Sequence, residues 1–373
     1  MNEIKAKLIL EDGSVFEGIG FGYPTNVSGE IVFNTGMVGY TETLTDPSYK
    51  GQILCFTYPS IGNYGVPSLD NLDEYGLPRY FESDRIQTSG IIVNNLSNVS
   101  SHWTCERTLD QWLYDERIPG ITNVDTRELT KKIRLHGVMS GKLVMEESDN
   151  YKDVTFDYDS HNFMPEVSVS QPKVYGDENN QSKIVLIDTG TKYSIIRNLL
   201  KLGFCVIRLP WNASIKEILS YHPYGVVISN GPGDPIICKE TISTASAIIE
   251  NSIPTLGICL GNQILALAGG AKTHKLKFGH RGQNKSCVDL KSKITIITSQ
   301  NHGYGVDSDS LEETEFEVWF KNIDDNTVEG IRHRNKPVIA VQFHPEASPG
   351  PDDCLYIFDE FKELVNRNRI VAS

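Results

Sequence analysis

Residues 255–268 read TLGICLGNQILALA, an apolar run followed by Gly-x-Cys-x-Gly and then a second apolar run. This order predicts a strand over Thr255–Cys259 and a helix over Gly261–Ala268, because glycines on both sides of Cys259 let the chain turn sharply. A strand, a sharp turn and a helix form a nucleophile elbow, here with a thiol, and the positive end of the helix favours a thiolate. The plainer alternative is a buried cysteine between packing glycines. The flanking strand and helix favour the nucleophile.

Strands and helices alternate on both sides of this elbow from residue 183 onward. Short apolar runs that end in polar residues are typical of buried parallel strands. Their alternation with helical segments predicts an α/β fold class, with a doubly wound domain over residues 183–373 that binds ligands at the carboxyl ends of its strands. The expected strands are 184–188, 205–208, 225–229, 294–298 and 338–343, and the expected helices are 193–202, 241–250 and 355–366.

The preceding part of the chain is β-rich. Residues 6–10 and 14–18 are apolar runs on either side of Asp12-Gly13, which predicts a hairpin. Further β-type runs lie at 30–34, 51–57 and 89–93, and helical segments at 108–116 and 125–135. These elements predict an α+β domain over residues 1–150. Residues 151–182 are rich in Asp, Asn, Ser and Tyr without a regular period, which predicts a linker.

Composition excludes several classes of protein. The formal net charge of −13 disfavours a nucleic-acid partner, because neutralising phosphates requires a basic surface. No apolar run reaches the roughly 20 residues that span a bilayer, so no membrane association is expected. The seven cysteines contain no CxxC pair, and the N-terminus lacks the apolar core of a signal peptide. We therefore expect reduced thiols in the cytoplasm.

A second motif, Gln342-Phe343-His344-Pro345-Glu346, follows the last predicted strand. Histidine is the usual base for a cysteine nucleophile, and a carboxylate orients it. Residues two apart share one side of an extended segment, so Glu346 can hold one ring nitrogen of His344 while the other faces Cys259. A solvent-facing pair at the end of a strand is the alternative, which the presence of the elbow disfavours.

Two further segments carry polar groups at the ends of strands. Asn230–Pro235 reads NGPGDP, and its backbone amides could point at a developing oxyanion, although a plain turn is an equal reading. Ser299–Tyr304 contains His302, which ranks below His344 as a base because no carboxylate lies near it in the sequence. Lys272–Arg281 is interpreted as a solvated or partner-facing loop. We expect no metal site, and neither a Walker phosphate loop nor a GxGxxG motif is present.

With these motifs in place, the C-terminal half resembles the class I glutamine amidotransferases. The residues that carry this resemblance are NGPGDP at 230–235, GICLGNQ at 257–263 and His344-Pro345-Glu346. Other segments are similar to the small-subunit family of carbamoyl-phosphate synthetases, and nearly the whole chain is covered. These segments are FNTGMVGYTE at 33–42, LTDPSY at 44–49, GNYG at 62–65, VDTRELT at 124–130, KFGHRG at 277–282 and SQNHG at 299–303.

The resemblance implies roles for individual residues. Cys259 is the implied nucleophile, His344 its base and Glu346 the residue that orients His344. The amides of Gly233 and Leu260 are the implied oxyanion hole. Glutamine-binding residues are implied at Ser48, reaching in from the N-terminal domain, and at Gly231, Gly233, Leu260, Gln263, Asn301, Gly303 and Tyr304. Two positions depart from the family pattern, with Asn262 where histidine is more common and Tyr304 where phenylalanine is.

The resemblance also implies an activity and a partner. Glutamine would be hydrolysed to glutamate and ammonia, and the ammonia channelled to a large subunit that makes carbamoyl phosphate from bicarbonate and ATP. A heterodimer or higher oligomer is implied, with no cofactor in this chain and with ATP and Mg²⁺ on the large subunit. Arginine and pyrimidine synthesis are both open as uses of the product. The alternatives are an inactive amidotransferase-like regulatory subunit and an amidotransferase that serves another synthetase.

Overall fold

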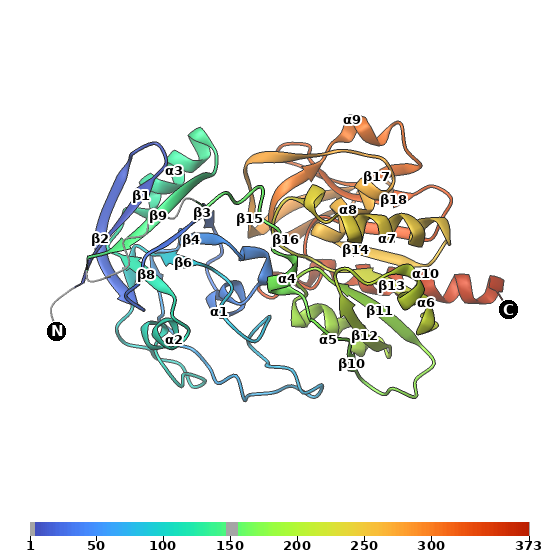
Figure 1. Cartoon of the computed structure of the whole chain (residues 1–373), viewed down its shortest axis with the longest axis horizontal. Coiled ribbons are helices and arrows are strands. Elements are labelled where there is room, and N and C mark those ends of the chain that lie inside the picture. The colour runs from blue at the N-terminus through green and yellow to red at the C-terminus, as the bar shows by residue number, and fades with distance from the viewer. Residues whose placement is uncertain (1–3, 147–155, 373) are drawn as a thin grey trace. The chain divides into compact units, whose positions relative to one another are not determined.

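A computed structural model describes residues 4–146 and 156–372, with the residues from 369 on described by their backbone alone. The chain divides into two compact units, Met1–His161 and Asn162–Ser373 (Figure 1). The first unit is built on a closed β-barrel, and the second on a mixed sheet with helices on its faces. The predicted class, a β-rich domain followed by an α/β domain, is therefore confirmed.

The barrel closes in the strand order β1-β2-β8-β6-β4-β3-β9. Strands β1 and β2 form the predicted hairpin, in which Leu8 pairs with Phe16. The parallel strands β3, β4 and β6 contribute fully buried side chains, among them Val32, Leu54 and Ile91. The strands of this unit are β1 (Lys5–Leu10), β2 (Val15–Gly22), β3 (Val27–Asn34), β4 (Gln52–Phe56), β5 (Ser60–Ile61), β6 (Gly90–Ile92), β7 (Asn95–Leu96), β8 (Pro119–Thr122) and β9 (Met139–Met145).

Side-chain caps start the two longer helices of the first unit where the sequence predicts them. The Thr108 hydroxyl accepts a hydrogen bond from the Gln111 amide at 3.1 Å, and the Asp125 carboxylate accepts one from the Glu128 amide at 2.9 Å. Each cap satisfies an amide that has no partner within its helix. The helical segments are α1 (Tyr40–Leu44), η1 (Pro47–Tyr49), α2 (Leu109–Asp115) and α3 (Thr126–His136).

The second unit contains a ten-stranded sheet in the order β10-β12-β11-β13-β14-β19-β18-β16-β15-β17. Strands β12, β11, β13, β14 and β19 run parallel, so their carboxyl ends meet at one edge. Strand β18 pairs antiparallel with β19 and starts the antiparallel part. The strands are β10 (Lys173–Tyr175), β11 (Lys183–Asp188), β12 (Cys205–Pro210), β13 (Gly225–Ile228), β14 (Thr255–Ile258), β15 (Thr273–Asp289), β16 (Thr295–Val306), β17 (Phe316–Asn322), β18 (Val328–His333) and β19 (Val338–Val341).

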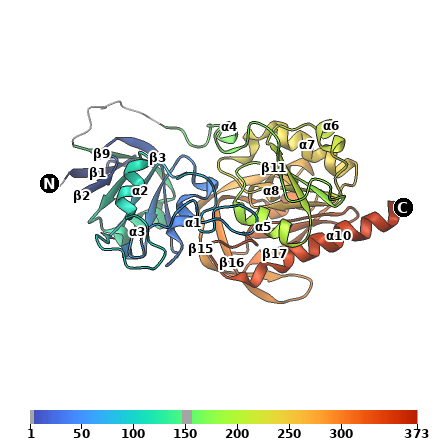
Figure 2. The same ribbon diagram turned by 90° about the horizontal axis from the view of Figure 1, so that it is seen from below.

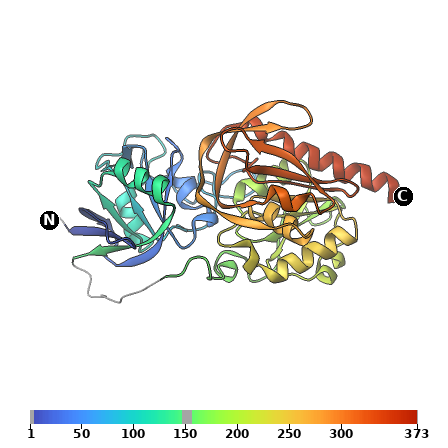
Figure 3. The same cartoon turned by 90° about the horizontal axis from the view of Figure 1, so that it is seen from above.

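Helices cover both faces of this sheet, as a doubly wound arrangement requires. Figures 2 and 3 show α7 and α10 on opposite sides of it. Within the described residues, no helix combines the length and the apolar character needed to cross a bilayer. The helical segments are α4 (Met164–Val167), α5 (Tyr193–Lys201), α6 (Ile215–Ser220), η2 (Pro235–Ile237), α7 (Lys239–Glu250), α8 (Leu260–Ala268), α9 (Ser308–Leu311), η3 (Asp352–Cys354) and α10 (Tyr356–Ala372).

Only part of the segment predicted as a linker, 151–182, lies before the boundary between the two units. Residues 151–155 lie outside the described ranges, and the boundary between the units falls after His161. From Asn162 onward the chain belongs to the second unit, where β10 adds an antiparallel edge strand to β12. The sequence did not predict β10, because this strand is only three residues long and shows no clear apolar period. Its hydrogen bonds go to β12, a strand about 30 residues further along the chain.

The interpretation of Lys272–Arg281 as a solvated or partner-facing loop is wrong, because the segment is not a loop. Most of this segment lies in the long strand β15, which pairs antiparallel with β16 and places His280 opposite His302. Lys275 and Lys277 are exposed, whereas His280 and Arg281 are buried. The lysines that suggested a solvated loop are therefore the exposed residues of a strand. The buried residues of the same strand pair with β16, which the local sequence does not reveal.

Replacing Leu54 by alanine should destabilise the barrel. Leu54 is fully buried in β4, so Leu54→Ala should lower the free energy of unfolding by about 2–5 kcal/mol through lost burial and a cavity. Urea unfolding followed by circular dichroism measures this. The matched control is Leu135→Ala in α3, where the side chain is 67% exposed and the effect should be near zero. Equal effects of the two substitutions would contradict the barrel core described above.

Candidate active site

Cys259 lies between β14 and α8, at the carboxyl end of a buried parallel strand. Its backbone has φ 55° and ψ −102°, a strained conformation for any residue with a side chain. The Cys259 amide still donates to the Val341 carbonyl of β19 at 2.8 Å, so the sheet pairing continues into the turn. The predicted strand, elbow and helix are thus present, with helix α8 beginning directly at Leu260.

Two glycines permit the close approach of backbones around the elbow. A Cβ atom at Gly261 would lie 2.2 Å from the Ile228 carbonyl oxygen, and one at Gly231 would lie 1.9 Å from the Thr189 carbonyl oxygen. Both distances are far inside van der Waals contact, so only glycine fits without displacing the neighbouring strands. Gly261 thereby lets α8 pack directly against the end of β13.

His344 follows β19, the strand that neighbours β14 in the sheet. Its Nδ1 lies 2.6 Å from the Glu346 Oε1, and the same carboxylate oxygen lies 3.1 Å from the Lys192 Nζ. All three side chains are buried. Because Nδ1 faces a carboxylate, the N–H lies on Nδ1 and leaves Nε2 as the basic nitrogen. Within the described residues Nε2 is buried and has no hydrogen-bond partner.

The charges of this group are coupled. Burial alone would lower the pKa of His344, but Glu346 and Cys259 outweigh it and raise the pKa to about 10. Burial alone would raise the pKa of Glu346, but Lys192 and His344 outweigh it and lower the pKa to about 2. The buried Glu346 carboxylate is therefore flanked by two cations, the His344 imidazolium and the Lys192 ammonium.

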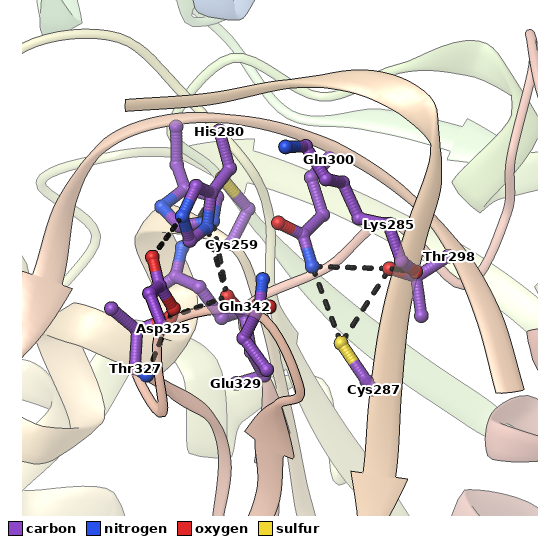
Figure 4. A network of polar contacts seen from close by, with 12 residues as sticks. Cys259, His280, Lys285, Cys287, Thr298, Gln300, Asp325, Thr327, Glu329 and Gln342 are labelled. Atoms are coloured by element: carbon purple, nitrogen blue, oxygen red, sulfur yellow. Dashed lines mark hydrogen bonds and ion pairs between the residues drawn. The ribbon is translucent and has the colours of Figure 1, made fainter. Parts of the chain in front are cut away.

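Two polar groups lie near the sulfur of Cys259. Its Sγ lies 3.6 Å from the backbone carbonyl oxygen of Asn301. The side-chain Nε2 of Gln342 lies 3.7 Å from Sγ (Figure 4). The Oε1 of Gln342 accepts hydrogen bonds from Asn262 at 3.1 Å and from Gln263 at 3.2 Å. Asn262, the departure from the family pattern, thus helps to orient the amide that contacts the sulfur.

The structure brings most of the predicted glutamine-binding residues to this edge of the sheet. Gln263 of α8 donates to the Tyr304 carbonyl at 2.9 Å, which ties the helix to β16. Gly233 has φ 87°, in the left-handed region that favours glycine. The remaining predicted residues of this unit lie in the turn after β13 (Gly231), at the start of α8 (Leu260) and in β16 (Asn301 and Gly303). Ser48 belongs to η1 of the first unit, and its role stays a prediction.

His302 has a carboxylate neighbour that the sequence did not reveal. Its Nε2 lies 3.7 Å from the Glu329 Oε1 of β18, and its Nδ1 lies 2.9 Å from the Tyr304 carbonyl oxygen. Burial lowers the pKa of His302, and the raising effect of Glu329 does not outweigh it. A carboxylate therefore does lie beside His302, contrary to the prediction, while the effect of Cys259 in raising the pKa of His344 keeps His344 as the candidate base.

Sequence reasoning missed Lys192 and Gln342 as parts of the site. Lys192 follows β11 in a turn that Asp188 holds by accepting hydrogen bonds from the Gly190 and Thr191 amides, at 3.2 and 2.9 Å. Arg208 pairs with the other oxygen of Asp188 at 2.8 Å. The available signal was a polar run, Asp188–Lys192, at the carboxyl end of a predicted strand, where ligand-binding residues gather.

Each of the two units matches a family of known proteins. Residues 8–143 match the family model described as carbamoyl-phosphate synthase small chain, CPSase domain, and residues 185–364 match that of glutamine amidotransferase class-I. The chain is 50% identical over 368 residues to the carbamoyl phosphate synthase small chain of Pyrococcus furiosus, which covers 97% of this chain and 98% of that protein. The chain belongs to the carbamoyl-phosphate synthase small-chain family.

Other members of the small-chain family come from distant organisms. The carbamoyl phosphate synthase arginine-specific small chain of Chaetomium globosum is 45% identical over 97% of this chain and 78% of its own length. The multifunctional protein CAD of Squalus acanthias is 47% identical over 96% of this chain, which corresponds to 16% of that protein. In the latter case a region equivalent to nearly this whole small chain is one part of a much longer polypeptide. The predicted family is confirmed.

Removing Lys192 should produce a pH-dependent loss of stability. Glu346 has a folded pKa of about 2, below its ordinary value of 4.5, so its stabilisation is present above about 4.5 and lost as the pH falls through about 2. Lys192→Met leaves a buried carboxylate facing only His344 and should cost about 3–5 kcal/mol at neutral pH. The cost should shrink as the pH is lowered, because Glu346 of the variant protonates at a higher pH.

Urea unfolding at pH 7 and pH 4.5 measures this difference. The control is Lys131→Met, which removes a solvent-exposed pair with Glu128 at 3.7 Å and should leave stability near wild type at both values. A cost for Lys192→Met that stays constant or grows on acidification would show that Lys192 does not stabilise the Glu346 carboxylate.

Proposed function

We propose that this chain hydrolyses the side-chain amide of glutamine to glutamate and ammonia, and that the ammonia is used by a large synthetase subunit to make carbamoyl phosphate. The observation that carries the proposal is the buried series Lys192–Glu346–His344, which ends at a cysteine held on an elbow. A thiol, an imidazole and a carboxylate in this order form a complete nucleophile, base and orienting group. Membership of the small-chain family supports the same activity.

The residues suit a two-step acyl transfer. The Cys259 thiolate attacks the amide carbon of glutamine, forming a carbon–sulfur bond and placing negative charge on the amide oxygen. The imidazolium of His344 passes its Nε2 proton to the nitrogen, the carbon–nitrogen bond breaks, and ammonia leaves. Neutral His344 then takes a proton from water, whose oxygen attacks the thioester. The second tetrahedral intermediate collapses to glutamate and the restored thiolate–imidazolium pair.

Backbone amides would stabilise the oxyanion in both steps. Leu260 is the first residue of α8, so its amide has no acceptor within the helix and lies at the positive end of the helix dipole. Gly233 lies in the turn after β13, and Gly261 donates to the Ser229 carbonyl of the same region at 3.1 Å, which ties α8 to that turn. Loss of one oxyanion donor typically costs about 10²–10³ in rate.

Glutamine binding is proposed for residues on the same edge of the sheet. Gly231 and Gly233 would bound one side of the substrate, and Gln263, Asn301, Gly303 and Tyr304 the other. Two contacts support the second group: the Asn301 carbonyl lies 3.6 Å from the Cys259 sulfur, and Gln263, close to Cys259 on the elbow, donates to the Tyr304 carbonyl at 2.9 Å. An amide-rich lining suits a substrate that is itself an amide.

A partner subunit is proposed because the synthesis of carbamoyl phosphate needs ATP, for which this chain carries no recognisable binding motif. The sequence carries neither a Walker phosphate loop nor a GxGxxG motif, so we assign ATP and Mg²⁺ to the large subunit. The name small chain, borne by the Pyrococcus furiosus relative, supports a two-subunit enzyme. Ammonia released at Cys259 must reach the partner before it is protonated in bulk water, which favours an internal route between the subunits over release into solvent.

Cys259→Ser should separate the two halves of the reaction. With a purified large subunit, glutamine-dependent carbamoyl phosphate formation should fall by about 10³-fold or more, because an alcohol is not ionised by the neighbouring imidazole. Synthesis from added ammonia should stay near the wild-type rate. The matched control, Cys105→Ser in the first unit, should leave both rates unchanged. Persistence of the glutamine-dependent rate in Cys259→Ser would refute the assignment.

An electrophilic glutamine analogue provides a second measurement. Mass spectrometry of the complex after treatment should find the analogue on Cys259 and not on the other buried cysteines, because burial raises the pKa of Cys55 and Cys238 to about 12. Competition by glutamine should protect Cys259. If Cys259 stays unlabelled with the large subunit bound, the chain is an inert regulatory relative.

A further inference from the structure

A second cluster of ionisable side chains lies in the antiparallel part of the sheet. His280 of β15, His302 of β16 and Glu329 of β18 come from three different strands and converge. Asp325 lies beside His280 (Figure 4). His280 is 5% exposed, His302 6% and Glu329 0%. The proposed hydrolysis of glutamine assigns no role to this cluster, so its burial needs a separate explanation.

The atoms of the cluster have the spacing of metal ligands. The His280 Nδ1 lies 3.1 Å from the Glu329 Oε1, and the His302 Nε2 lies 3.7 Å from the same oxygen. One ligand atom from each of the three residues lies within 4.8 Å of the others. Ligands that bind an ion tetrahedrally at about 2.0–2.1 Å are about 3.3 Å apart, close to these separations.

In both histidines, the ring nitrogen that points away from Glu329 is hydrogen-bonded, as it is in metal sites. The His280 Nε2 lies 2.7 Å from the Asp325 Oδ2, and the His302 Nδ1 lies 2.9 Å from the Tyr304 carbonyl oxygen. Asp325 is itself fixed by the Thr327 hydroxyl, at 2.7 Å. Histidines that bind metals usually donate the other ring N–H to a carboxylate or a carbonyl, which turns the free lone pair toward the ion. Both rings satisfy this condition.

Two polar atoms of the cluster have no hydrogen-bond partner among the described residues. They are the His302 Nε2 and the Glu329 Oε2, and both are buried. Buried polar atoms are nearly always hydrogen-bonded, so two unsatisfied atoms in one cluster require a cause. A cation bound by the His302 Nε2 and by both oxygens of the Glu329 carboxylate would satisfy both atoms at once.

We propose that His280, His302 and Glu329 bind a divalent first-row transition-metal ion, with Zn²⁺ the best match. Imidazole and carboxylate ligands suit this class of ion, and three protein ligands leave one position for water. The ion would join β15, β16 and β18. His302 directly follows Asn301, whose carbonyl contacts Cys259, so the ion would also fix the strand that faces the nucleophile. The site stands independently of the proposed hydrolysis.

Metal content of the full chain tests the proposal. The chain is stripped with a chelator, incubated with Zn²⁺ or Co²⁺, desalted, and analysed by elemental mass spectrometry and visible absorption. All measurements are made on the Cys259→Ser protein, so that the reactive thiol cannot bind the metal ion. We expect about one ion per chain, a Co²⁺ spectrum of low coordination number without thiolate charge transfer, and a raised melting temperature. Retention of less than about a tenth of an ion per chain would overturn the proposal, and a proton shared by His280, Asp325 and Glu329 would then explain the burial.

Variants locate the ion. Glu329→Gln and His302→Asn keep the approximate shape of the side chains, and both should abolish stoichiometric binding. Asp325→Asn, which changes only the residue behind His280, should weaken Zn²⁺ affinity by about 10–100-fold. The matched control is His274→Asn, an exposed histidine on the same strand, which should bind as the Cys259→Ser protein does. Unchanged binding in a folded Glu329→Gln chain, checked by circular dichroism, would place the ion elsewhere and refute the site.

Discussion

The Glu346 carboxylate is buried and is balanced by two cations, the Lys192 ammonium and the His344 imidazolium. A buried charge of this kind is tolerated only when its partners are held in place. Lys192 is placed by the turn that Asp188 organises, and Asp188 is in turn paired with Arg208. The charge balance around His344, the candidate base, therefore depends on residues at the ends of β19, β11 and β12, and not on the elbow alone.

The parallel sheet explains why residues far apart in the sequence meet. Strands β11, β13, β14 and β19 are neighbours, and their carboxyl ends deliver Lys192, the Asn230–Pro235 turn, Cys259 and His344 to one edge. Close packing at Gly231 and Gly261 keeps these turns within hydrogen-bonding range. The antiparallel extension adds β16, where the Asn301 carbonyl lies near the sulfur and the Tyr304 carbonyl accepts a hydrogen bond from Gln263 of α8.

Features encoded by short sequence patterns were predictable. The elbow, the hairpin of β1 and β2 and the caps of α2 and α3 each depend on residues within a few positions of one another. Features that depend on distant partners were not. Lys192 resembles any polar residue after a strand until Glu346 is placed beside it. His280 and Glu329 are distant in sequence, and only the pairing of β15, β16 and β18 shows that they share one buried cluster.

Asn262 stands where relatives more often carry an imidazole, and it hydrogen-bonds the Gln342 amide that contacts the sulfur. An amide carries no proton that can be gained or lost in the physiological range, whereas an imidazole does. The Gln342 amide that contacts the sulfur is consequently held by a side chain whose charge is the same at every physiological pH, so this contact does not depend on protonation.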